Sequence, residues 1–91
     1  QNYPNPFNPS TTIKYDIGLM DGLEQRVNVN VYNIVGQHVA TLVNNVGQVG
    51  QFYVKWDGTD KFGKMLPSGI YFVQLKTDSG IIKNKKMMLL K

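Results

Sequence analysis

The stretch Val54–Lys76, with the sequence VKWDGTDKFGKMLPSGIYFVQLK, decides how the rest of the chain is interpreted. It contains the single tryptophan, Trp56, directly before the turn-forming pair Asp57-Gly58. A second group of turn formers, Pro67-Ser68-Gly69, precedes a run of β-branched and aromatic residues that begins at Ile70. Because glycine, proline and aspartate favour turns, one strand is predicted to end at Trp56 and the next to begin at Ile70.

The strand predicted at Ile70–Thr77 has one plainly apolar face and one mixed face. Side chains alternate across a strand, so Tyr71, Val73 and Leu75 share the apolar face. The opposite face carries Ile70, Phe72, Gln74 and Lys76. A central strand, with one face on the core and the other partly covered, fits this pattern. With Trp56, the apolar face is expected to form the centre of the core.

Alternation of apolar and polar residues predicts further strands on both sides of this stretch. They cover Thr11–Ile17, Arg26–Tyr32, His38–Val43, Gln51–Trp56 and Ile81–Leu90. No window has the spacing of an amphipathic helix, so the predicted fold is all-β, an immunoglobulin-like antiparallel β-sandwich of about seven strands. The seventh strand would come from the proline-rich start or from Phe62–Leu66. The expected core comprises Ile13, Tyr15, Ile17, Val27, Val29, Val31, Leu42, Phe52, Val54, Trp56, Tyr71, Val73 and Leu75.

The length and composition indicate one small domain, residues 1–91, that is part of a larger protein. The 91 residues contain no cysteine, which excludes a disulfide framework and a thiolate site. No run approaches the roughly 20 apolar residues of a membrane-spanning helix. The chain begins at Gln1 without an initiator methionine, so we expect a module cut from a larger protein. The net charge is +4, and the basic residues gather late in the chain, at Lys76, Lys83, Lys85, Lys86 and Lys91.

Catalytic and cofactor chemistry is poorly represented in the sequence. His38 is the only imidazole, and nucleophilic catalysis needs a base that is itself oriented by a third group. The carboxylates fall mostly in predicted turns, where aspartate bonds its own backbone. Asp57-Gly58-Thr59-Asp60 could be considered as a calcium loop, but it lacks the further acidic ligands of an EF-hand. We therefore expect neither an enzyme nor a cofactor or metal site.

Six aromatic residues could lie outside the core and stack on a sugar. They are Tyr3, Phe7, Tyr32, Tyr53, Phe62 and Phe72. A carbohydrate-binding module would require several of them in one flat row. Nucleic-acid binding is not expected, because basic and aromatic residues are not interleaved over one predicted face.

The last predicted strand combines a lysine-rich middle with an apolar end, IIKNKKMMLLK at 81–91. One interpretation is an edge strand whose lysines prevent unwanted sheet pairing. Another is an exposed tag that offers charge and a strand edge to a receptor. The two interpretations are compatible, and the residues alone do not choose between them.

Four motifs, in this order along the chain, carry a resemblance to a known family. They are YPNPFNP at 3–9, VYNIVGQ at 31–37, PSGIYF at 67–72 and KKMMLLK at 85–91. Together they resemble a type A C-terminal sorting domain of the type IX secretion system (Por secretion). The chain is also similar to the immunoglobulin-like domain of the flagellar hook-capping protein, which such sorting domains resemble.

This resemblance implies a non-catalytic signal domain. Such a domain directs a covalently linked upstream cargo through the periplasm and an outer-membrane translocon to the cell surface or medium. The implied partners are translocon components and a sortase-like peptidase, with indirect association to the outer-membrane surface. The family's glycine and double-lysine motif falls on Gly80, Lys85 and Lys86, and its terminal lysine falls on Lys91. We expect these residues, with Lys83 in the same strand, to contact a partner. The family's structural motif falls on Pro67, Gly69 and Tyr71, with Trp56 beside them. The alternatives are a carbohydrate-binding module or a structural spacer of a secreted hydrolase.

Overall fold

The computed structural model describes residues 11–17, 25–47, 50–78, 80 and 82–90, which form six β-strands. All strand pairs are antiparallel. The described ranges contain no helix long and apolar enough to cross a membrane. The strands are β1 (Thr11–Ile17), β2 (Gln25–Tyr32), β3 (His38–Gly47), β4 (Gly50–Trp56), β5 (Gly69–Thr77) and β6 (Ile82–Leu89).

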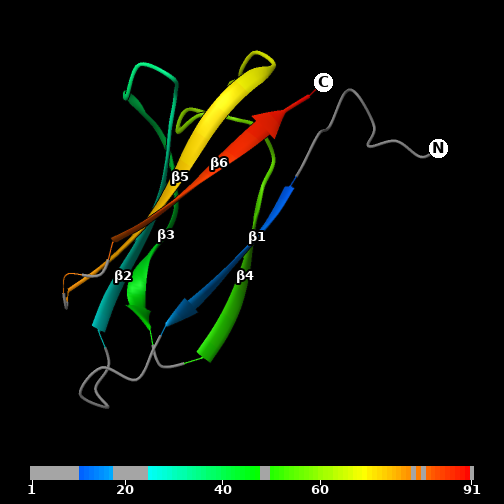
Figure 1. The fold of residues 1–91 in the computed structure, drawn as a ribbon. Helices are drawn as coiled ribbons and strands as arrows, with labels where there is room; N and C mark the ends of the chain where they lie inside the picture. The colour runs from blue at the N-terminus through cyan, green and yellow to red at the C-terminus, as the bar shows by residue number, and fades with distance from the viewer. Residues whose placement is uncertain (1–10, 18–24, 48–49, 79, 81, 91) are drawn as a thin grey trace.

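The strands form two sheets of unequal width that pack face to face (Figure 1). The small sheet has two strands in the order β1-β4, and the large sheet has four in the order β3-β2-β5-β6. β3 and β4 approach each other at one side of the sandwich. The predicted all-β antiparallel sandwich is therefore confirmed, and β5 is a central strand as its two faces indicated.

Six strands are present in the described ranges, where the sequence predicted about seven. Phe62–Leu66 does not form the additional strand, because this loop contributes only the isolated bridge between Thr59 and Met65. The proline-rich start, the other candidate, lies outside the described residues.

The predicted alternation is clearest where β2 and β5 pair at the centre of the large sheet. Val29 lies opposite Leu75, and Val31 lies opposite Val73. Val27, Val29 and Val31 are at most 1% exposed. Branched side chains on a pleated surface pack well against opposing strands, which explains why these residues form the floor of the core.

Strand β3 differs from its prediction in its length and in the face on which its side chains lie. It continues to Gly47 rather than ending at Val43, and its pairing with β2 shifts twice, between Val29 and Asn30 and between Val31 and Tyr32. A bulge places an extra residue on one strand and interrupts strict alternation. Leu42 and Val43, predicted on opposite faces, consequently both pack against the core.

The core is close to the predicted set but extends further into β3 and β6. Ala40, Met87 and Leu89 are buried although the sequence did not place them in the core. The predicted core residues Tyr15, Leu42, Phe52 and Val54 are only partly buried and pack around its margin. The small sheet is two strands wide, so its members lie near an open side. At about 1.5–3 kcal/mol for each fully buried large side chain, the central residues still provide the main driving force.

We predict that Gly47→Ala destabilises the domain by about 1–2 kcal/mol, because overpacking a filled core forces neighbouring atoms to move. A Cβ at Gly47 would lie 2.9 Å from Ile17 Cδ1 and 3.0 Å from Val27 Cγ2. Urea unfolding measures the change. Val46→Ala, at an exposed neighbouring position, is the control, and equal stability of the two variants would contradict the overpacking argument.

Candidate functional site

The lysines of β6 lie on an edge of the large sheet, but they do not all share a face. Lys83 lies opposite Leu75 and Lys85 opposite Val73, so both are on the core-facing side of the sheet. Lys86 lies opposite Phe72 and is on the outer side. All three are exposed. The predicted edge position is thus confirmed, while the division of the lysines between two faces was not expected.

The change from lysine to apolar residues along β6 follows the burial of the strand, whose last residues enter the core. Met87, opposite Tyr71, and Leu89, opposite Gly69, are buried. Lys83 and Lys85 occupy the same face farther from that end and reach solvent. Burying an unpaired ammonium group is costly, so lysine is suited only to the uncovered part of the face.

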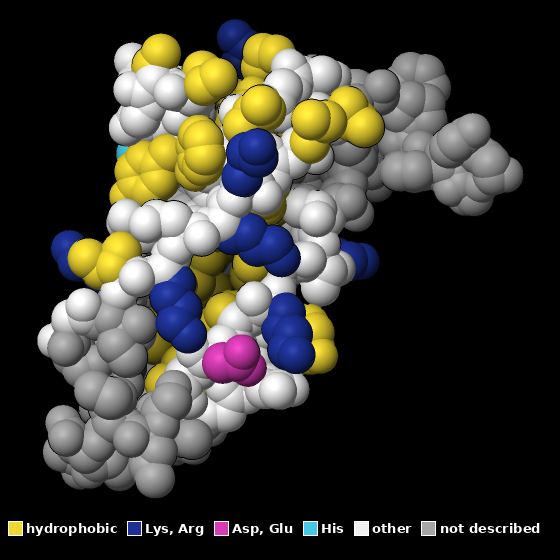
Figure 2. Space-filling model, viewed as in Figure 1, with side chains coloured by type: hydrophobic (Ala, Val, Ile, Leu, Met, Phe, Trp, Pro, Cys, Tyr) yellow, Lys and Arg dark blue, Asp and Glu magenta, His cyan; other side chains and the backbone are white. Residues whose placement is uncertain are grey.

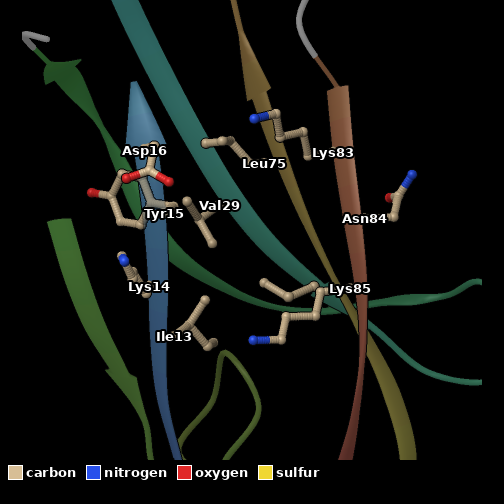
Figure 3. A pocket seen from close by; sticks show the side chains of 10 residues that line it. Ile13, Lys14, Tyr15, Asp16, Val29, Leu75, Lys83, Asn84 and Lys85 are labelled. Atoms are coloured by element: carbon tan, nitrogen blue, oxygen red, sulfur yellow. The ribbon is translucent and has the colours of Figure 1, made fainter. Parts of the chain in front are cut away.

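A groove of about 260 Å³ lies between β1 and β6. Successive residues of each strand line it, Ile13 to Asp16 from β1 and Lys83 to Lys85 from β6 (Figure 3). Its floor is formed by Val29, Val73 and Leu75 of the large sheet. Figure 2 shows the corresponding surface as a hollow with an apolar floor and basic side chains around it.

The rim of this groove is predominantly basic. Lys14, Lys83 and Lys85 border it together with one carboxylate, Asp16. The structure records no ion pair for these lysines among the residues that it describes. Burial raises the pKa of the Tyr15 phenol on the same wall, so this hydroxyl is neutral. The groove therefore offers apolar contact below and positive charge above.

The residues predicted to build the fold, Trp56, Pro67, Gly69 and Tyr71, lie together around the β4–β5 connection. The Trp56 and Tyr71 rings meet edge to face with centroids 5.3 Å apart. Tyr71 donates its hydroxyl hydrogen bond to the Pro67 carbonyl at 2.7 Å, and Trp56 Nε1 donates to the Thr59 carbonyl at 3.0 Å. Gly69 pairs with Leu89 at the beginning of β5.

The remaining predicted partner-binding residues are Gly80 and Lys91. Gly80 has a φ of +93°, and its N–H donates to the Thr77 carbonyl at 3.0 Å. The left-handed backbone favours glycine there, so the turn itself accounts for this residue. Lys91 lies outside the described residues.

The side chains considered for catalysis or calcium binding are engaged in local structure. His38 Nε2 lies 3.2 Å from Asn30 Oδ1 and 3.0 Å from Thr41 Oγ1 on an exposed surface. Asp57 Oδ1 accepts the Thr59 N–H, and Asp60 Oδ1 accepts two loop N–H groups. Within the described ranges, no three metal-binding side chains gather. This geometry is that of two aspartate-capped turns.

The exposed aromatic residues do not form one row within the described part of the chain. Tyr53 and Phe62 are 65% and 83% exposed, on β4 of the small sheet and on the β4–β5 loop. Tyr32 and Phe72 lie opposite each other on the large sheet and are half-buried. Tyr3 and Phe7 lie outside the described residues. The four of these aromatic residues that lie in the described ranges therefore give the carbohydrate-binding alternative no flat platform.

The groove was not predicted from the sequence, because its two walls are remote in the chain and belong to different sheets. The alternation in Thr11–Ile17 predicted a strand and gave Lys14 and Asp16 no functional role. A signal was nevertheless present in β6, where Lys83 and Lys85 alternate in phase with the apolar residues Met87 and Leu89. When lysines occupy the same face of a strand as buried apolar residues, that face leaves the core and reaches solvent.

Comparisons with known proteins identify the type of domain. The family model described as the FlgD Ig-like domain matches residues 10–80. β6 and its lysines therefore lie beyond the matched range. A solved structure, FLGD from P. aeruginosa, matches with a TM-score of 0.64 at 24% identity. The match covers 89% of this chain and 60% of that one. No match was found among curated proteins.

We predict that Tyr71→Phe lowers the free energy of unfolding by about 1 kcal/mol, the usual contribution of one hydrogen bond. The variant keeps the ring contact with Trp56 and loses only the bond to the Pro67 carbonyl. Chemical denaturation gives the difference. Tyr53→Phe, on an exposed ring, is the matched control, and an equally small effect at both positions would contradict a structural role for the Tyr71 hydroxyl.

Asp60 is predicted to stabilise the β4–β5 loop in a pH-dependent manner. Hydrogen bonds from the Lys64 and Phe62 N–H groups lower its pKa below the ordinary value of 3.8. A carboxyl group whose pKa is lowered by folding stabilises the folded state fully at pH values above its ordinary pKa of 3.8. This stabilisation is lost as the pH falls through the pKa of the folded state. The stability difference between the wild type and Asp60→Asn should therefore shrink below pH 3.8. A difference that stays constant in denaturation curves from neutral to acidic pH would rule this out.

Proposed function

Because the chain belongs to the FlgD Ig-like domain family, we propose that it is a non-catalytic β-sandwich module that works as a C-terminal sorting signal. The module directs a covalently linked cargo protein through the type IX outer-membrane translocon. In this proposal it passes through the periplasm and ends at the cell surface or in the medium. Its partners are translocon components and a sortase-like peptidase, and it associates with the outer-membrane surface only through them.

The observation that carries this proposal is the exposed lysine edge of β6. Lys83, Lys85 and Lys86 are exposed and have no ion pair among the described residues. Solvated lysines contribute little to stability, so the fold itself does not require three of them. They also lie beyond the range that the family model matches. Exposed positive charges along an unpaired strand edge are suited to recognition by a partner.

Removal of the final strand would not test this proposal cleanly, because β6 is also part of the core. Met87 and Leu89 are buried, so a truncation from Gly80 onward would expose the core as well as remove the lysines. Substitutions that keep the strand separate recognition from folding.

We predict that Lys83→Ala, Lys85→Ala and Lys86→Ala, combined, block export but change the free energy of unfolding by less than about 0.5 kcal/mol per site. The domain is fused to a soluble reporter in a type IX-competent bacterium, and the reporter is located by fractionation. The wild-type fusion should reach the surface or medium, while the triple variant stays in the periplasm. Lys55→Ala, Lys61→Ala and Lys64→Ala, combined, make the matched control with the same charge change elsewhere, and this control should be exported.

Equal export of both triple variants would remove the lysines from the mechanism. A folded wild-type fusion that remains in the periplasm would refute the sorting function itself.

A second candidate function is that of a module in a flagellar hook-capping protein. The observation that favours it is the family match over residues 10–80. In this case the β6 lysines would be solubilising edge charges. The test is whether the domain restores motility when it replaces the corresponding domain of a hook-capping protein. Restored motility together with failed export would select this candidate.

A further inference from the structure

The two sheets leave one side of the sandwich open, and the groove between β1 and β6 lies on this side. The small sheet is two strands wide and the large sheet four, so the inner face of β5 and β6 extends beyond β1. Among the described strands, β1 pairs only with β4, and β6 pairs only with β5. The edges of β1 and β6 that pair with no other described strand therefore border the same groove, and within the described residues the backbone groups along this edge of β1 are unpaired.

The shape of the groove corresponds to the position of a third strand in the small sheet. Its walls are consecutive residues of β1 and β6, so each strand borders the groove along its length. Its floor is the inner face of the large sheet, at Val73 and Leu75, and Figure 3 shows Leu75 there. A strand added beside β1 would cover this floor as β1 and β4 cover the rest of the core.

The charges around the groove define the chemistry of such a strand. Lys83 and Lys85 are two residues apart on the core-facing side of β6, and Figure 3 shows both side chains reaching from β6 toward the gap. Lys14 also lines the groove, with its side chain on the outer face of β1. Carboxylates at alternate positions of an added strand would meet these ammonium groups, because side chains on one face of a strand recur every second residue. Asp16 disfavours a further carboxylate directly beside it.

We propose that the β1–β6 groove binds an extended acidic segment of a partner protein, which pairs with the free edge of β1 as an added β-strand. Apolar side chains of the segment lie on Val73 and Leu75, and its intervening carboxylates point outward beside Lys14, where the long Lys83 and Lys85 side chains reach them from the opposite wall. Main-chain hydrogen bonds provide affinity in this mode of recognition, and the alternate side chains provide specificity. The inference deepens the proposed function by naming the chemistry of the partner, but peptide binding is measured on the isolated chain and does not depend on export.

The test titrates the isotope-labelled chain with a terminally blocked peptide, Thr-Val-Glu-Val-Glu-Val-Thr, and follows amide and methyl resonances. We expect shifts confined to β1 from Ile13 to Asp16, to β6 from Lys83 to Lys85, and to the Val73 and Leu75 methyl groups. The affinity should fall as salt is added. Two control peptides separate the contribution of charge from that of strand pairing. One has lysine in place of glutamate, and the other is N-methylated at alternate positions so that it cannot pair as a strand.

Charge variants of the chain provide the second readout. Lys83→Gln with Lys85→Gln should weaken binding about tenfold, as expected for lost charge-assisted contacts. Lys55→Gln with Lys61→Gln removes the same charge elsewhere and should leave the affinity unchanged. Resonances outside the groove report whether each variant remains folded.

Several results would overturn the proposal. These are the absence of binding, shifts that map to the outer face of the large sheet, and equal binding of the N-methylated peptide. Without peptide, concentration-dependent shifts at the groove would identify a second copy of the chain as its occupant. Nuclear Overhauser contacts between residues 1–10 and the Val73 methyl groups would assign the groove to the chain's own first segment. Either finding would show that the groove is occupied by this protein itself and not by a strand of a partner.

Discussion

The contact between Trp56 and Tyr71 is the interaction on which the rest of the structure depends. Trp56 ends β4 of the small sheet and Tyr71 lies in β5 of the large sheet, so their edge-to-face contact joins the two layers. Such pairs add about 0.5–1.5 kcal/mol beyond the area that they bury. Each ring also carries a polar atom that must be satisfied on burial. The carbonyls of Thr59 and Pro67, both in the intervening loop, provide the two acceptors.

This arrangement explains why a loop rich in turn formers can connect two core strands. The loop satisfies the indole and phenol groups while Asp57 and Asp60 cap its own turns. No buried side-chain nitrogen or oxygen lacks a partner in the described ranges. Because unsatisfied polar groups are costly inside a protein, the aromatic contact and the loop conformation support each other.

The unequal width of the sheets determines which parts of the large sheet are available to a partner. Toward its end, β6 contributes Met87 and Leu89 to the core; nearer its beginning, the same face carries Lys83 and Lys85, which reach solvent. One strand thus belongs both to the scaffold and to the candidate interaction surface. The family relationship describes the scaffold over residues 10–80, and the features proposed for recognition lie largely in the strand beyond it.

The sequence by itself determined the all-β class, five of the strand positions to within about a residue, and the central role of Trp56, Tyr71, Val73 and Leu75. These features follow from local alternation and turn chemistry, which act over a few residues. Only the tertiary structure decided the length of β3, the burial of Met87 and Leu89, and the groove between β1 and β6. The bulges in β3 depend on pairing with β2, and the groove depends on which strands lie opposite each other. Neither relation can be read from local spacing, because both join residues that are distant in the chain.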